Sequence, residues 1–209
     1  MAINATNSGA KRELIPAGNY MARCYQMIHI GTVEENILGE LKTLNKVRIS
    51  WELPTEMRVF KPENGEQPCA ISKSYTLSLN EKANLRKMLA SWRGKDFTED
   101  EAKKFDISKL IGVPCMLNLI HKPSKDGTKV YEEIGSISPM PKGVVCPDGI
   151  NPQSVLDYEN WSWDIFNKQP DFIKAMIESS VEFKAMTNIP VDIANDNDTH
   201  GENETDLPF

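Results

Sequence analysis

Alternation of apolar and polar residues runs through most of the first two thirds of the chain. In the stretch 43–53, Val47, Ile49 and Trp51 alternate with polar or charged residues, which is the period of a β-strand with one buried face. The same period predicts five strands in all, over residues 19–33, 43–53, 69–79, 113–121 and 128–137. On the first strand it predicts a core face of Tyr20, Ala22, Cys24, Ile28 and Ile30, opposite Met21, Arg23, Tyr25, Met27 and His29.

One helix is predicted between the third and fourth strands. It begins with Asn80 as cap and ends at Gly94, because Asn favours helix starts and Gly favours helix ends. A capping box at Thr98 predicts a second, short helix. The sequence Asp126-Gly127 predicts a hairpin between the last two strands. This order is that of the OB-fold, a five-stranded Greek-key barrel, although other five-stranded barrels share much of it.

Residues 14–142 are therefore predicted to form the barrel, which is mainly β, after a flexible N-terminus at 1–13. Residues 143–187 are expected to form a linker and a helical extension, with Phe172, Ile173, Met176 and Ile177 at core spacing after Pro170. The extension is expected to pack either on the barrel or on a second subunit.

Residues 188–209 hold six acidic residues and no Lys or Arg. Such a polar, charged segment buries too little apolar area to offset its ordering entropy, so we expect a disordered acidic tail. The tail accounts for the whole formal net charge of −6. Residues 1–150 carry a small basic surplus of 21 Lys and Arg over 18 Asp and Glu.

Compartment and metal chemistry are also constrained by the sequence. There is no apolar run of membrane-spanning length and no secretory signal, so a cytoplasmic protein is expected. The four cysteines and three histidines lack zinc-ligand spacing. We therefore predict buried free thiols, and neither a metal nor a cofactor.

Basic and ring-bearing residues gather on the predicted polar barrel face and on the last hairpin. Single-strand binding needs cations for phosphates and flat rings on which bases stack. Any one of these residues alone is typical of solvated surface charge, so the inference depends on their clustering. The candidate DNA-binding residues are Arg23, Tyr25, His29, Lys46, Arg48, Lys73, Lys122, Lys125, Lys129 and Tyr131.

Other aromatic residues are assigned mainly to packing. Trp51 and Trp92 share the apolar faces of a strand and a helix, which favours the core. Tyr75, Trp161 and Trp163 are left open between packing and base stacking, with packing favoured for the two tryptophans.

Enzyme motifs are absent from the sequence, including the phosphate-binding glycine loops and H-E-x-x-H. The neighbouring acids Glu34-Glu35 and Glu132-Glu133 point to opposite faces of a strand, so neither pair converges on one metal ion. We expect no catalytic residue and a protein that is not an enzyme.

Three internal stretches and the end of the chain resemble known proteins. The stretches are 16–23 (PAGNYMAR), 49–54 (ISWELP) and 166–184, which opens with FNKQPDFI and closes with SVEFK. Together they resemble phage-encoded single-stranded-DNA-binding proteins of OB-fold type. The ending Asp206-Leu207-Pro208-Phe209 is similar to the acidic tip of bacterial single-stranded-DNA-binding proteins, with one adjacent acid where several are usual.

The resemblance implies non-catalytic, largely sequence-independent coating of single-stranded DNA in phage replication, recombination or repair, in the cytoplasm of a bacterial host. It also implies that the tip recruits replication or repair proteins. Two alternatives stay open: a barrel that binds protein instead of DNA, and a recombination accessory factor that anneals strands. A homo-oligomer is possible in each case.

Overall fold

The computed structural model describes residues 13–124 and 126–187. Three predicted features lie outside the described residues. They are the flexible N-terminus except for its residue 13, the candidate residue Lys125, and the acidic tail with its tip, Asp206-Leu207-Pro208-Phe209. The chain is mainly β, and its strands are β1 (Gly18–Ile37), β2 (Glu40–Val59), β3 (Glu66–Thr76), β4 (Pro114–Pro123), β5 (Val130–Ser138) and β6 (Ser154–Leu156). The helices are α1 (Asn84–Arg93), α2 (Glu99–Lys104), α3 (Trp163–Asn167), α4 (Asp171–Ser179) and α5 (Val181–Met186), with short 3-10 turns at Pro62–Asn64 and Ile107–Leu110.

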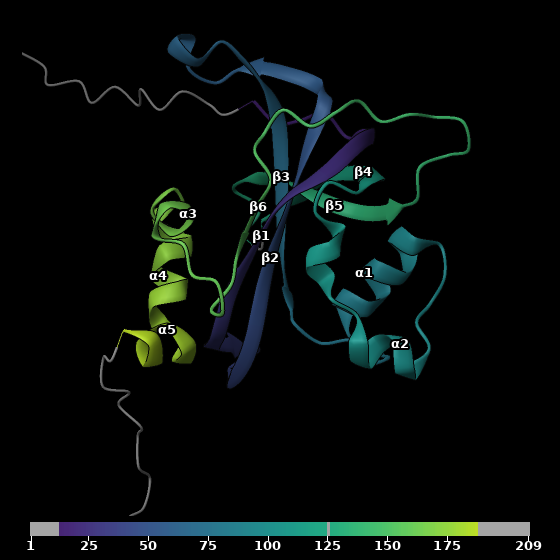
Figure 1. Ribbon diagram of the computed structural model, residues 1–209. Helices are drawn as coiled ribbons and strands as arrows, with labels where there is room; N and C mark the ends of the chain where they lie inside the picture. The colour runs from purple at the N-terminus through teal and green to yellow at the C-terminus, as the bar shows by residue number, and fades with distance from the viewer. Residues whose placement is uncertain (1–12, 125, 188–209) are drawn as a thin grey trace, which may run out of the picture.

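The strands form one sheet in the order β3-β2-β1-β4-β5, with the short β6 parallel to β1 and every other pair antiparallel. All five predicted strands are present, and β6 was not predicted. The edge strands β3 and β5 come together at one point, where Lys73 Nζ donates to the carbonyl oxygen of Ile134 at 3.3 Å. Helices α1 and α2 lie on one side of the sheet and α3 to α5 on the other (Figure 1).

The main core lies on the side of the sheet that carries α1. It contains residues from β1 to β5 and from α1, including Trp51 and Trp92, whose ring centroids lie 5.9 Å apart. The prediction that both tryptophans pack in the core is confirmed, and Tyr75 also packs there at 7% exposure. The helix starts later than predicted: Ala83 is the N-cap, and residues 80–83 form a turn closed by Ala83 N and Asn80 O. The capping box at Thr98 is confirmed.

A bulge in β1 overturns the predicted alternation of that strand. Cys24 pairs with Trp51 and Gln26 pairs with Ser50, so Tyr25 is an extra residue without a partner on β2. A β-bulge shifts the side-chain parity beyond it. Met27 therefore joins the main core, and Ile28 and Ile30 face the other way. The predicted single core face through Ile28 and Ile30 is wrong for this reason.

Ile28 and Ile30 instead start a second core under the C-terminal helices. Both are fully buried, and they pack with Ile173, Ile177 and other residues of the extension. The extension is also fixed by polar contacts: Glu182 accepts hydrogen bonds from the backbone nitrogen of Thr32 at 2.6 Å and from its hydroxyl at 2.7 Å. Of the two predicted packings, the structure has the extension packed on the sheet.

Residues 146–151 lie against β1 and β2, where two charged side chains hold them. The guanidinium of Arg23 donates to the carbonyls of Gly112 (2.7 Å), Cys146 (3.1 Å) and Pro147 (2.9 Å). The buried carboxylate of Glu52 accepts from the backbone nitrogens of residues 150 and 151 at 3.1 and 2.9 Å. We call this arrangement the Arg23–Glu52 clasp.

The described residues also bear on the cysteines, on membrane-spanning helices and on metal-ligand groups. All four cysteines are buried and none of them forms a disulfide, as predicted. In residues 13–124 and 126–187, no helix has the length and apolar character needed to span a membrane. Within the same ranges, no group of three or more His, Cys, Asp or Glu residues is placed to hold a metal ion.

Candidate nucleic-acid interface

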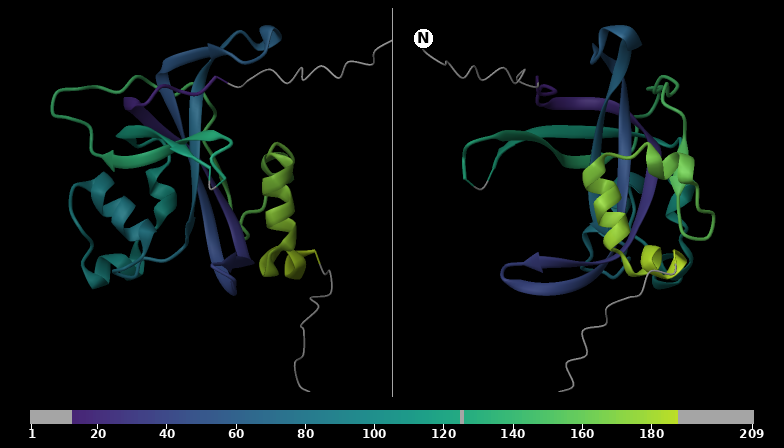
Figure 2. Two further views of the ribbon diagram at one scale, coloured as in Figure 1. Left: turned by 180° about the vertical axis from the view of Figure 1, so that it is seen from behind. Right: turned by 90° about the vertical axis from the view of Figure 1, so that its left-hand side faces the viewer.

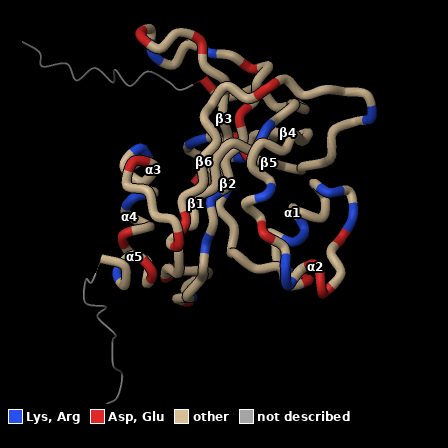
Figure 3. Tube along the Cα trace, in the orientation of Figure 1, with Lys and Arg blue, Asp and Glu red and all other residues tan. Residues whose placement is uncertain are grey.

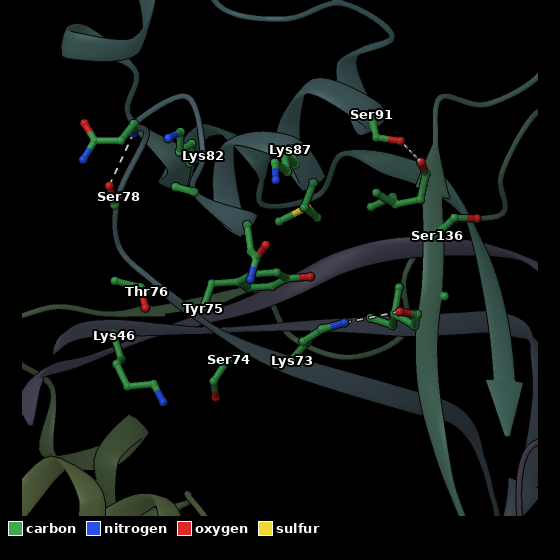
Figure 4. A pocket seen from close by; sticks show the side chains of 17 residues that line it. Lys46, Lys73, Ser74, Tyr75, Thr76, Ser78, Lys82, Lys87, Ser91 and Ser136 are labelled. Atoms are coloured by element: carbon green, nitrogen blue, oxygen red, sulfur yellow. Dashed lines mark hydrogen bonds between the residues drawn. The ribbon is translucent and has the colours of Figure 1, made fainter. Parts of the chain in front are cut away.

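A groove of roughly 880 Å³ lies where β3 and β5 approach each other next to α1 (Figure 4). Its lining includes four lysines and no Asp or Glu. We call it the lysine groove. Its lining residues are Lys46, Lys73, Ser74, Tyr75, Thr76, Ser78, Asn80, Lys82, Ala83, Asn84, Lys87, Met88, Ser91, Ile134, Gly135, Ser136 and Ile137.

The groove is lined by polar side chains and by a few buried apolar ones, including Met88, Ile134 and Ile137. Tyr75 adds a buried ring, and burial raises the pKa of its hydroxyl far above the usual value, so the side chain stays neutral. On the α1 side, the Ser91 hydroxyl donates to the Ile137 carbonyl at 2.5 Å and joins helix and strand. Gly135 on β5 has little room for a side chain, because a Cβ there would approach the Asn118 amide oxygen to 3.1 Å.

Two of the four lysines are already paired with carboxylates just outside the lining. Lys46 Nζ lies 2.6 Å from Glu35 and Lys73 Nζ lies 3.3 Å from Glu133. Lys122 also binds Glu133, at 2.8 Å, and this contact is the main cause that holds the pKa of Glu133 below its usual value. The paired lysines therefore add little net positive potential to the groove.

The other two lysines carry the uncompensated charge. Lys82 and Lys87 are exposed, and neither forms an ion pair within the part of the chain that the structure describes. They flank the start of α1, whose N-cap residue Ala83 has no side-chain hydrogen bond to the helix. A helix start carries partial positive charge on its free N–H groups. An anion in the groove would therefore meet two cations and a helix start together.

The two long hairpins project in the same direction from the sheet (Figure 2). The β1–β2 hairpin turns at Leu38 and Gly39, and the β4–β5 hairpin carries exposed Lys129 and Tyr131 near its end. Lys and Arg are interspersed with Asp and Glu over most of the chain (Figure 3). A local gathering of unpaired cations is therefore more informative than the total charge.

The structure brings some of the predicted DNA-binding residues together. Lys46 and Lys73 both line the lysine groove. Tyr25 and Arg48 are neighbours on another part of the sheet, since the charge of Arg48 lowers the pKa of Tyr25 against the larger effect of burial, which raises it. Lys122, Lys129 and Tyr131 share the β4–β5 hairpin.

Other predicted residues are committed elsewhere. Arg23 is used in the Arg23–Glu52 clasp, with a side chain that is 17% exposed. His29 Nε2 lies 2.8 Å from the Asn45 amide oxygen, and its ring packs on Tyr158 at 5.2 Å between centroids. Arg23 and His29 therefore do not join one cleft with Lys46. The predicted continuous face along β1 is interrupted by the bulge at Tyr25.

Three residues of interest were missed from the sequence. Lys87 lies opposite the apolar stripe of α1 and Lys82 lies in the turn just before it. The sequence pattern marks both as exposed but does not show what lies next to them. Phe172 was assigned to the core, yet 58% of its surface is exposed, because Ile173 and Ile177 take the buried positions on α4. Of the two open tryptophans, Trp161 packs against Tyr158 and Trp163 is 52% exposed.

Comparisons with known proteins add no relative. No family model, no curated protein and no solved structure matches this chain.

Proposed function

We propose that this protein binds single-stranded DNA, with little sequence preference and without catalysis, through the lysine groove of an OB-fold. The observation that carries this proposal is the groove itself: four lysines, two of them unpaired, beside an uncapped helix start, with no acidic residue in the lining. Phosphate contacts supply most of the affinity in such binding. Exposed side chains with flat faces supply base stacking.

The OB-fold assignment is supported by the order of the elements. An OB-fold is a five-stranded, partly open Greek-key barrel. Here β3-β2-β1-β4-β5 is the order of the main strands, α1 lies between β3 and β4 in the chain, and Lys73 links the two sheet edges. The hairpins β1–β2 and β4–β5 would then flank the bound strand.

Titration with fluorescent oligonucleotides tests the proposed function. We expect a dT oligonucleotide to bind more tightly than duplex DNA of the same length, and binding to weaken strongly between about 50 and 200 mM salt. Fluorescence anisotropy measures both. Absence of dT binding at low salt would favour a barrel that binds protein. Binding accompanied by faster pairing of complementary strands would instead identify an annealing factor.

A second part of the proposal concerns the acidic tail and its tip. The sequence Asp206-Leu207-Pro208-Phe209 is proposed to recruit replication or repair proteins of a bacterial host, because a terminal Pro-Phe presents a compact apolar group beside acids. Removing residues 188–209 is expected to leave dT affinity unchanged or higher, since six acids are lost, and to abolish partner capture.

Pull-down from host lysate with full-length and truncated protein measures the capture, and anisotropy measures the DNA affinity. Phe209→Ala is the finer variant, because it keeps every acid and removes only the terminal ring. Weaker dT binding after truncation, or equal capture by the truncated protein, contradicts the proposed role of the tail.

A further inference from the structure

Phe172, Arg48 and Tyr25 form a small cluster of flat side chains on the side of the sheet that carries α4, which we call the Arg48 platform. The Arg48 guanidinium carbon lies 5.5 Å from the centroid of the Phe172 ring. Arg48 and Tyr25 are half-buried, whereas Phe172 is 58% exposed. The ring therefore has one face near a cation and a large surface open to solvent.

The platform is connected to the lysine groove through Lys46, which lines the groove and shares a face of β2 with Arg48. Lys46 is opposite Thr76 and Arg48 is opposite Ser74 in the β2–β3 pairing, with no bulge between them. Residues two apart on a strand share a face about 7 Å apart. Lys46, Ser74 and Thr76 all line the groove. A single strand of DNA that leaves the groove past Lys46 would therefore reach Arg48 next.

Packing alone does not account for the position of Phe172. On α4 the buried positions are taken by Ile173 and Ile177, both 0% exposed. Phe172 lies beside this apolar stripe and reaches toward Arg48 on β2. An exposed aromatic ring over a guanidinium is a surface on which a nucleobase can stack, because every base has a flat π-face.

We propose that Phe172 is a base-stacking residue, and that a single strand runs from the lysine groove over Lys46 and Arg48 to place one base on its ring. The Arg48 guanidinium packs on the ring and positions it. Arg48 also places positive charge near the phosphate backbone of the DNA strand. This inference rests on the proposed function, and it extends the binding site from the barrel onto the C-terminal helices.

The test compares Phe172→Ala with wild type in binding a dT oligonucleotide longer than about 16 nucleotides, the upper site size of one OB-fold. We expect affinity to fall by roughly 5- to 150-fold, because one stacked base contributes about 1 to 3 kcal/mol. Phe172→Trp should restore affinity. Phe172→Leu, which keeps an apolar side chain without a π-face, should not.

Phe60→Ala is the matched control, because Phe60 is 57% exposed and lies beyond the end of β2 that is remote from Lys46. Its affinity should equal that of wild type. A direct readout uses Phe172→Trp and Phe60→Trp: the tryptophan added at position 172 should be quenched on DNA binding, and the one at position 60 should not.

The possible failures are distinguishable. If wild type does not bind the oligonucleotide, the proposed function fails and this inference fails with it. If wild type binds, and substitution of Lys82 and Lys87 weakens binding, but Phe172→Ala binds like wild type, then only the stacking role of Phe172 is overturned. Equal loss of affinity in Phe172→Ala and Phe60→Ala overturns it as well.

Discussion

Reversing the charge of Lys82 and Lys87 together, as Lys82→Glu/Lys87→Glu, is expected to weaken dT binding by about 100-fold at low salt. These are the two lysines of the lysine groove without an ion pair within the described ranges. The slope of log affinity against log salt should become shallower by about 1.4, since each lost phosphate contact contributes about 0.7 on single strands. Anisotropy titrations over a series of salt concentrations measure both quantities.

The control reverses the same number of charges at another part of the surface. Lys103 and Lys109 are exposed and do not line the groove, so Lys103→Glu/Lys109→Glu carries the same change in net charge. Its effect should be small and should come only from the long-range field. Equal effects of the two double variants would show that net charge, and not the groove, governs binding, and the proposed interface would be wrong.

Replacing Glu52 by Ala should lower the free energy of unfolding by about 3 kcal/mol, because buried donors then lose a charged acceptor. Glu52 is 0% exposed, and its Oε2 accepts from two backbone nitrogens and from the Asn151 side-chain amide at 2.9 Å. A Cβ added at Gly149 would overlap its Oε1, so residues 146–151 fit closely over the carboxylate.

Urea denaturation followed by tryptophan fluorescence measures this loss. Glu63→Ala is the control, because Glu63 is exposed in the loop before β3 and surface changes usually stay within about 0.5 kcal/mol. Glu52→Gln keeps one acceptor for residues 150 and 151 and should lose less than Glu52→Ala. Wild-type stability in Glu52→Ala would mean that the Arg23–Glu52 clasp does not hold this segment to the sheet.

Much of the local structure could be predicted from the sequence. Alternation located the five main strands, and the capping box at Thr98 and the stop at Gly94 were placed correctly. The start of α1 was placed three residues too early, because Asn80 is a good cap by residue type but forms a turn here. The burial of Trp51 and Trp92 followed from periodicity alone.

The candidate site was predicted less well. Lys46 and Lys73 were among the predicted DNA-binding residues, and both line the groove. Lys82 and Lys87, which also line it, were not among the predicted residues, and neither was Phe172. Arg23 was chosen for its place on a polar face, but the structure uses it to hold residues 146 and 147. The local sequence could not distinguish these uses, because the pattern around an arginine on a strand is the same whether the side chain binds a phosphate or a carbonyl of a distant segment.

The sequence by itself determined the mainly β character, the position of the helix between the third and fourth strands and the apolar stripes, because these depend on neighbours a few residues away. Only the tertiary structure decided the bulge at Tyr25, the second core under α4 and the meeting of β3, β5 and α1 around the lysine groove. These features depend on register and packing between segments far apart in the sequence, such as Cys24 with Trp51, Thr32 with Glu182 and Lys73 with Glu133. A local pattern carries no record of such pairings.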